Sequence, residues 1–278
     1  MKIAIITGAS SGMGREFALQ MDCHFANIDE FWLVARREEE LVTLAESLTH
    51  PCRIFAMDLT MKGQIQRIED AARLEDAKIC MLVQCAGFGL MGPLEVLPVK
   101  DTVSMIKLNC EALTELTGRM LPFMARNGRI IFLASSAAFL PQPEFSVYAA
   151  SKSYVLSFAR ALAVELRSKE IYVTAVCPGP VDTPFFDIAE KTGSTLAFKK
   201  AFMACPEDVV AKALRDSFLR KPVSVYGCSM NAFQLMTKLL PHGAILSAMK
   251  WIKDAEKARS AESFLKEGEQ GTEGRLQA

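Results

Sequence analysis

Residues 2–21, KIAIITGASSGMGREFALQM, decide the fold of this 278-residue chain. The β-branched apolar run at residues 3–7 predicts a buried strand, and the pattern after the glycines predicts a helix. Because Gly8, Gly12 and Gly14 have no side chains, the turn between them can be tight and can approach a phosphate at the helix N-terminus. Their spacing is G-x-x-x-G-x-G rather than the commoner G-x-G-x-x-G. The strand-to-helix context favours dinucleotide binding over a plain tight loop.

Further apolar runs repeat this strand-then-helix pattern along the chain. Strands are predicted at residues 31–35, 54–57, 79–83, 129–134, 172–176 and 224–226, and helices at 36–48, 62–74, 101–120, 146–167 and 206–220. The repetition predicts an α/β fold, Rossmann-like and doubly wound, with a mostly parallel seven-stranded sheet and helices on both faces. We expect one domain over residues 1–278, with a core to about residue 227 and a mostly helical extension, broken near Pro241, over 228–278.

Composition excludes several classes of protein. Lys plus Arg and Asp plus Glu both total 32, so net charge gives no reason to expect nucleic acid or an anionic membrane as partner. Half of the residues are hydrophobic, which excludes a disordered chain. No signal-peptide pattern follows the first strand and no apolar run is long enough to span a bilayer, so we expect a cytoplasmic protein.

The cysteines and histidines do not form a metal-binding pattern. The eight cysteines contain no C-x-x-C pair, and the three histidines, His24, His50 and His242, are widely separated. We therefore expect reduced thiols, ordinary histidines and no metal site.

The second predicted strand ends at Arg36 and Arg37, where an NAD-preferring unit usually carries an acidic residue. Guanidinium groups suit a 2′-phosphate, which favours NADP(H) over NAD(H). Alternatively, the arginines pair with the glutamates that follow in RREEE, an explanation that competes more strongly for Arg37 than for Arg36. After the third strand, Asp58 is expected either to contact the adenine edge or to cap the next segment.

A second informative stretch is SSAAFLPQPEFSVYAASK at residues 135–152. Tyr148 and Lys152 are four residues apart and share one face of the predicted helix. Because a nearby ammonium stabilises a phenolate, we expect Lys152 to lower the pKa of Tyr148. The fifth strand delivers Ser135 to its C-terminal end, where ligands collect in open α/β sheets. Asn109 lies among apolar residues and needs hydrogen-bond partners, either backbone groups or a water near the site.

Taken together, these residues resemble the classical short-chain dehydrogenase/reductase family over about residues 1–227. TGASSGMG, Asn109, Ser135, YAASK and PGPVDT occur in family order at suitable separations. The resemblance implies an oxidoreductase that transfers a hydride between nicotinamide and a small-molecule ketone, aldehyde or alcohol. It also implies a homodimer or homotetramer.

The resemblance further implies roles for individual residues. Tyr148 would donate a proton to the substrate oxygen, and Ser135 would hydrogen-bond the same oxygen. Lys152 would bind the nicotinamide ribose and lower the pKa of Tyr148. Asn109 would hold a water that links Lys152 to solvent. The cofactor-binding residues would be Gly8, Ser10, Ser11, Gly12, Met13 and Gly14 at the phosphates and ribose, Arg36 and Arg37 at the NADP phosphate, Asp58 and Leu59 at adenine, Ala86, Gly87, Tyr148 and Lys152 at ribose, and Pro178, Gly179, Val181 and Thr183 at nicotinamide.

Two details depart from a simple match. The family often has Asn-Asn-Ala-Gly where this chain has Gln84-Cys85-Ala86-Gly87, and we interpret Cys85 as a structural variation without loss of activity. Ser135 lies 13 positions before Tyr148 and Ser136 lies 12 before it. The first separation is the one associated with the family, so Ser135 is the predicted catalytic serine and Ser136 the alternative.

The substrate and the function leave alternatives open. Phe139, Leu140, Phe145, Phe185 and Phe186, together with the Met-rich extension, indicate either an apolar pocket for a bulky carbonyl compound or ordinary core packing. Residues 187–205 are expected to form a substrate lid or a connector. A noncatalytic NAD(P)-binding sensor or scaffold explains the glycine turn but leaves the Ser, Tyr, Lys and Asn without a role. A sugar-nucleotide epimerase or dehydratase is disfavoured by the short glycine motif and limited C-terminal region.

Overall fold

The computed structural model describes residues 1–190 and 203–247. The chain divides into two compact units between Ala232 and Phe233, and the first unit contains the whole sheet. Most of the predicted lid or connector, and residues 248–278 of the predicted extension, lie outside the described residues. No helix within the described ranges is both long enough and apolar enough to cross a membrane.

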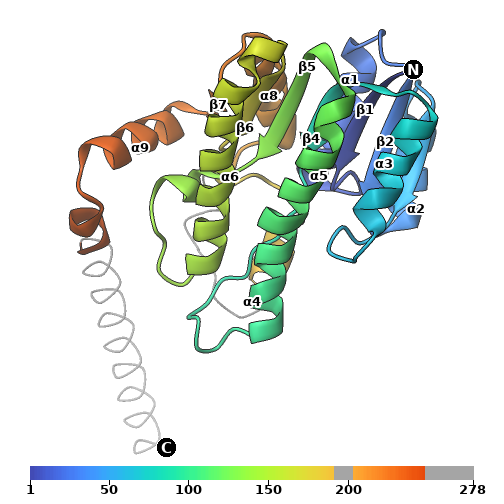
Figure 1. The fold of residues 1–278 in the computed structure, drawn as a ribbon. Helices are drawn as coiled ribbons and strands as arrows, with labels where there is room; N and C mark the ends of the chain where they lie inside the picture. The colour runs from blue at the N-terminus through green and yellow to red at the C-terminus, as the bar shows by residue number, and fades with distance from the viewer. Residues whose placement is uncertain (191–202, 248–278) are drawn as a thin grey trace, which may run out of the picture. The chain divides into compact units, whose positions relative to one another are not determined.

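Seven strands form one sheet, which confirms the predicted fold class (Figure 1). Every neighbouring pair is parallel, and the order is β3-β2-β1-β4-β5-β6-β7. The strand order therefore reverses between β1 and β4, where open sheets of this kind bind ligands. The strands are β1 (Lys2–Thr7), β2 (Glu30–Ala35), β3 (Cys52–Ala56), β4 (Lys78–Gln84), β5 (Met124–Leu133), β6 (Tyr172–Val176) and β7 (Val223–Ser224).

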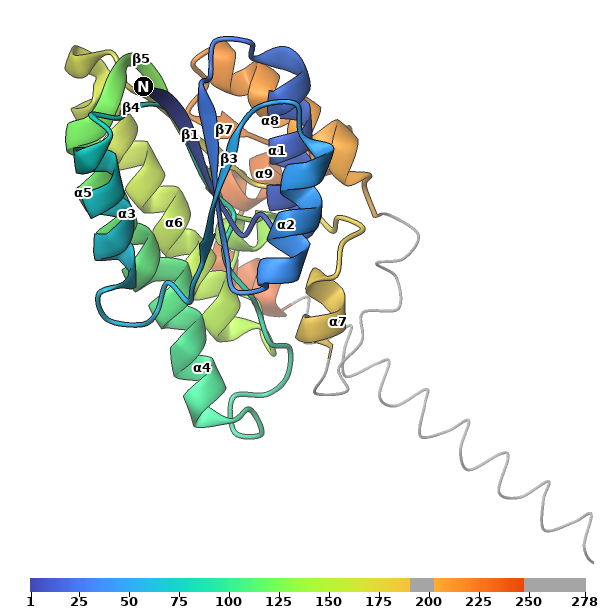
Figure 2. The same cartoon turned by 90° about the vertical axis from the view of Figure 1, so that its right-hand side faces the viewer.

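Helices cover both faces of the sheet (Figure 2). On β1, Ile3 and Ile5 pack toward α3, α5 and α6, whereas Ala4 and Ile6 pack toward α1, α2 and α8, and all four side chains are fully buried. The alternation follows from the two-residue period of a strand. The helices are α1 (Gly12–His24), α2 (Glu38–Ser47), α3 (Gln64–Leu74), α4 (Val99–Ile106), α5 (Leu113–Met120), α6 (Ser146–Glu165), α7 (Phe185–Ala189), α8 (Pro206–Phe218) and α9 (Cys228–Leu239).

The predicted continuous helix over residues 101–120 is wrong in one respect. A π-helical turn, Lys107–Ala112, separates α4 from α5 and contains Asn109. Such turns accommodate one extra residue and occur frequently at functional sites. Here the turn coincides with a fully buried asparagine whose side chain bonds the backbone of Phe88, a contact that the helical pattern did not predict.

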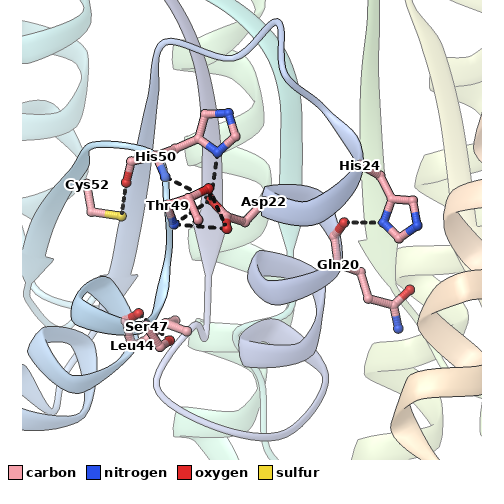
Figure 3. Close-up of polar contacts among 8 residues, drawn as sticks. All are labelled: Gln20, Asp22, His24, Leu44, Ser47, Thr49, His50 and Cys52. Atoms are coloured by element: carbon pink, nitrogen blue, oxygen red, sulfur yellow. Dashed lines mark hydrogen bonds and ion pairs between the residues drawn. The ribbon is translucent and has the colours of Figure 1, made fainter.

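A buried carboxylate fastens the end of α1 to the loop between α2 and β3 (Figure 3). Asp22 accepts hydrogen bonds from the backbone N–H of Thr49 at 2.9 Å and of His50 at 2.9 Å, from the Thr49 hydroxyl at 3.0 Å, and from His50 Nδ1 at 2.6 Å. Burial by itself raises the pKa of Asp22, but the bonds from Thr49 and His50 outweigh it and lower the pKa to about 2. The carboxylate therefore stabilises the fold in its ionised form.

We predict that Asp22→Asn lowers the free energy of unfolding by about 2 kcal/mol at pH 7. The amide has only one acceptor oxygen, so some of the N–H and O–H groups around it lose their partner. Because the wild-type pKa is lowered, the stabilisation is complete above about pH 4 and disappears as the pH falls toward 2, where the difference between the two proteins narrows. Urea denaturation across this pH range measures both effects.

The matched control is Asp76→Asn, because the Asp76 side chain is 91% exposed and pairs only with Lys78 at the surface. This control is expected to change stability by less than about 0.5 kcal/mol. Equal stabilities of Asp22→Asn and wild type at pH 7 would contradict the assignment.

Candidate active site

The glycine turn holds the ends of β1 and β4 in direct contact. Gly8 (φ +69°) and Gly12 (φ +52°) have left-handed backbone conformations that glycine adopts without strain. A Cβ atom on Gly8 would lie 2.8 Å from the backbone nitrogen of Ala86, and one on Gly14 would lie 2.3 Å from the carbonyl oxygen of Gly8. The first turn of α1 therefore starts directly above the strand end, where its N–H groups fit a phosphate.

The end of β2 reaches the same turn through Arg37. Its Nη2 donates to Ser10 Oγ at 3.1 Å, and its guanidinium also lies 3.7 Å from the carboxylate of Glu40. The contact with Glu40 is the glutamate pairing that the sequence allowed for Arg37, and its role at the NADP phosphate stays a prediction. Arg36 is exposed and forms no hydrogen bond or ion pair with other residues of the described ranges.

Asp58 and Leu59 follow β3. Asp58 Oδ1 accepts hydrogen bonds from the backbone nitrogen of Thr60 at 2.9 Å and from its hydroxyl at 2.7 Å. Leu59 is 8% exposed and packs in the core. The capping alternative for Asp58 thus has its partner in the structure, and a contact with adenine stays a prediction.

Beyond β4 the chain passes between two buried polar side chains. A Cβ atom on Gly87 would lie 2.9 Å from Asn109 Oδ1 and 3.3 Å from Lys152 Nζ. Asn109 Oδ1 accepts from the backbone nitrogen of Phe88 at 3.1 Å, and its Nδ2 donates to the Phe88 carbonyl at 2.9 Å and to Ser151 Oγ at 3.0 Å. The structure thus brings Gly87, Asn109 and Lys152 together, and their roles toward a cofactor stay predictions.

Ser135 and Tyr148 meet where the end of β5 faces the start of α6. The Ser135 side chain lies near enough to the Tyr148 phenol to lower its pKa, and its hydroxyl accepts the backbone N–H of Ala137 at 3.1 Å. Ser136 instead uses its backbone N–H, which donates to the carbonyl of Pro178 at 2.8 Å. Of the two serines, Ser135 is therefore the one that contacts the tyrosine.

Burial controls the proton affinities of the two central groups. It raises the pKa of Tyr148 to about 12, and the hydrogen bond from Ser135 offsets this only in part. It lowers the pKa of Lys152 to about 8. In this structure the prediction that Lys152 lowers the pKa of Tyr148 is wrong. The lysine Nζ lies 5.7 Å from the centre of the tyrosine ring and donates to the Leu133 carbonyl at 2.7 Å, so desolvation dominates.

The PGPVDT loop after β6 closes the other side of the site. A Cβ atom on Gly12 would lie 3.2 Å from Cβ of Thr183, so this loop contacts the glycine turn. A Cβ atom on Gly179 would lie 2.7 Å from the sulfur of Met230. Buried Val181 pairs with Ala204, while Ser11 immediately precedes α1 and Met13 is buried within it.

The Gln84-Cys85 pair behaves as a structural variation. Gln84 Nε2 donates to Thr117 Oγ1 at 2.7 Å, a buried bond that ties β4 to α5. Burial raises the pKa of the Cys85 thiol to about 12, so the thiol stays protonated. The central sheet is therefore connected to its helix through Gln84, a contact that the sequence did not predict.

Aromatic rings surround Tyr148. Phe145 stacks on it with ring centres 4.3 Å apart, and Phe185 approaches to 5.4 Å. A Cβ atom on Gly89 would lie 2.7 Å from Cδ2 of Tyr148. Gly89 was not among the predicted site residues, although a second glycine in Ala86-Gly-Phe-Gly was a usable signal. Phe139 packs against the core instead.

Comparison with known proteins identifies the family. The model of the short chain dehydrogenase family matches residues 2–192. This chain belongs to that family. An uncharacterised oxidoreductase of Staphylococcus epidermidis is 32% identical to it over 185 residues, which cover 66% of this chain and 79% of the relative. The chain is accordingly a short-chain dehydrogenase/reductase that acts on CH–OH or C=O groups.

Two solved structures share the fold. A short-chain dehydrogenase/reductase from Burkholderia phymatum in complex with NAD superposes with a TM-score of 0.73 at 24% identity, over 84% of this chain and 91% of that one. A short-chain dehydrogenase from Sphingobium yanoikuyae in complex with NADPH gives 0.71 at 25% identity, over 93% and 96%.

We predict that Gly14→Ala lowers the free energy of unfolding by about 2 kcal/mol and weakens NADPH and NADH binding at least tenfold. Its Cβ atom would lie 2.3 Å from the Gly8 carbonyl oxygen, so α1 has to move away from the strand end. Urea denaturation and fluorescence titration with each nucleotide measure the two effects.

Gly118→Ala is the matched control, since it makes the same substitution inside helix α5 with nothing within 4 Å of the new Cβ atom. We expect it to leave binding unchanged and to stabilise the protein by up to about 1 kcal/mol. Wild-type nucleotide affinity in Gly14→Ala would show that the turn does not hold the cofactor.

Proposed function

We propose that this chain is an NADP-dependent reductase of ketones or aldehydes with Tyr148 as its general acid. The observation that carries the proposal is the placement of Ser135, just after β5, and of Tyr148, in the first turn of α6, so close that the serine side chain lowers the pKa of the phenol. Lys152 and Asn109 lie beside it, and the glycine turn adjoins them through Gly87 and Ala86. A noncatalytic dinucleotide sensor has no use for this arrangement of proton donors.

The protonation state of Tyr148 favours reduction of a carbonyl over oxidation of an alcohol. With a pKa raised to about 12, Tyr148 remains protonated at neutral pH and can donate to the alkoxide that forms on the substrate. Ser135 donates a hydrogen bond to the same oxygen and stabilises its developing charge. A nicotinamide bound beside Tyr148 would supply the hydride to the carbonyl carbon, and the carbonyl π bond would break as the new C–H and O–H bonds form.

We assign Lys152 to the ribose hydroxyls of the cofactor and Asn109 to proton resupply. The Asn109 side chain forms three hydrogen bonds, two with Phe88 and one with Ser151, and these bonds fix its orientation. Its Oδ1 keeps a second lone pair, and Asn109 Oδ1 and Lys152 Nζ both lie within 3.3 Å of the place of a Cβ atom on Gly87. A water held by Asn109 would connect the lysine to solvent.

We assign the preference for NADP to Arg36. It is the exposed guanidinium at the end of β2 that has no partner within the described ranges, whereas Arg37 is engaged by Ser10 and Glu40. A guanidinium free to form a bidentate contact is well suited to a ribose 2′-phosphate. Asp58 and Leu59 would border the adenine from the end of β3.

We predict that Tyr148→Phe lowers kcat by about 10² to 10⁴-fold in NADPH-dependent carbonyl reduction, while nucleotide affinity changes less than about threefold. The ring and its packing remain, and only the proton donor is removed. Oxidation of NADPH over a panel of ketones, aldehydes and quinones measures the effect.

Tyr154→Phe is the control, because this phenol lies on the same helix and bonds Thr114 at 2.7 Å. Wild-type turnover in Tyr148→Phe would rule out this acid, and nucleotide binding without any turnover by wild type would favour a sensor.

We predict that Arg36→Leu lowers kcat/KM for NADPH by about 10- to 100-fold, the effect of losing one charge-assisted contact, with little change for NADH. Arg37→Leu is expected to lower kcat/KM for NADPH less than Arg36→Leu does, since the Arg37 guanidinium already pairs with Glu40. Steady-state kinetics with NADPH and NADH measure both effects. Equal or better use of NADH by the wild-type enzyme would remove the proposed role of Arg36.

A further inference from the structure

The surroundings of the Tyr148 phenol are unusually rich in aromatic rings. Tyr148 and Phe145 are nearly parallel, at 21°, with centres 4.3 Å apart, and Phe185 lies 5.4 Å away at 48°. Phe186 meets Phe185 edge to face, at 90° and 5.4 Å. Three ring contacts thus join four rings, from Phe145 through the proposed acid to the two phenylalanines of α7.

Backbone contacts between three loops hold these rings in place. The N–H of Gly92 donates to the carbonyl of Glu144 at 2.7 Å, next to Phe145, and the N–H of Met91 donates to the carbonyl of Ala189 at 2.9 Å, in α7. Gly89 fits against Tyr148 and Phe145 only because it lacks a side chain. The ring faces are therefore preorganised, which lowers the entropic cost of recognising a ligand.

The residues behind the rings are aliphatic. Leu90, Met91 and Leu97 are each at most 8% exposed and belong to the same apolar cluster as Phe145 and Tyr148. To a bound substrate, this cluster presents apolar surface together with the faces and edges of aromatic rings, but few polar partners. Because aromatic rings have a negative face and a positive edge, an aryl group gains from both kinds of neighbour, whereas a saturated ring gains only from burial.

We propose that the substrates are carbonyl compounds whose C=O group is attached to a planar aromatic ring, and that Phe185 is a specificity-determining residue for that ring. The proposal rests on the proposed function, since it takes Tyr148 as the group that meets the carbonyl oxygen. The aryl group then lies against Phe185 and Phe186. The reaction remains the hydride and proton transfer described above.

The experiment compares acetophenone with cyclohexyl methyl ketone, which has the same carbon skeleton with a saturated ring. The ratio of their kcat/KM values is measured with NADPH for the wild-type enzyme and for Phe185→Leu. Dividing one ratio by the other removes the difference in intrinsic reactivity of the two ketones. We expect the ratio to fall by about three- to tenfold in Phe185→Leu, the effect of one aromatic contact.

Phe25→Leu is the matched control, because that ring stacks on Phe218 outside the site and is expected to leave the ratio unchanged. An unchanged ratio in Phe185→Leu overturns the proposal while leaving the proposed function intact. Turnover of neither ketone nor any other carbonyl compound by wild type overturns both.

A second measurement on the wild-type enzyme covers the case in which Phe185→Leu does not fold. The alcohols 1-phenylethanol and 1-cyclohexylethanol are compared as inhibitors of NADPH oxidation with a reactive aldehyde as substrate. At least threefold tighter inhibition by the aryl alcohol supports the proposal. Equal or weaker inhibition by the aryl alcohol overturns it.

Discussion

The site depends on one close approach, that of the glycine turn after β1 to the end of β4. Gly8 lies so near the backbone of Ala86 that no side chain fits, and the Ala86 N–H donates to Thr7 Oγ1 at 3.2 Å. This contact joins the two strands at which the sheet order reverses. It aligns the start of α1 with the loop that carries Gly87, whose surroundings include Lys152 and Asn109.

A second constraint is the removal of water from the polar centre. Burial raises the pKa of Tyr148 and lowers that of Lys152, so both groups are shifted toward their neutral forms. The same apolar packing keeps Tyr148 among aromatic rings and leaves Cys85 protonated. Stability and chemistry therefore have a common origin here, since the residues that exclude water from the core also set the proton affinities of the site.

Much of the fold was predictable because its signals are local. The short apolar runs and the glycines after the first of them predicted all seven strands, although β5 begins five residues before its predicted start. The helix around Asn109 was predicted without its π-helical turn, because the bonds between Asn109 and Phe88 join segments remote in sequence. The spacing of Ser135 and Ser136 relative to Tyr148 favoured Ser135, and only the structure shows that the Ser135 side chain lies near enough to the phenol to lower its pKa.

By itself, the sequence determined the order of strands and helices, the glycine turn and the set of polar residues, because each depends on neighbours along the chain. Tertiary structure decided how those residues act on one another. The direction of the Tyr148 pKa shift, the engagement of Arg37 by Ser10 and the aromatic rings around the phenol all arise from groups on different elements. Desolvation and ring stacking depend on distances in space, and no spacing in a sequence measures them.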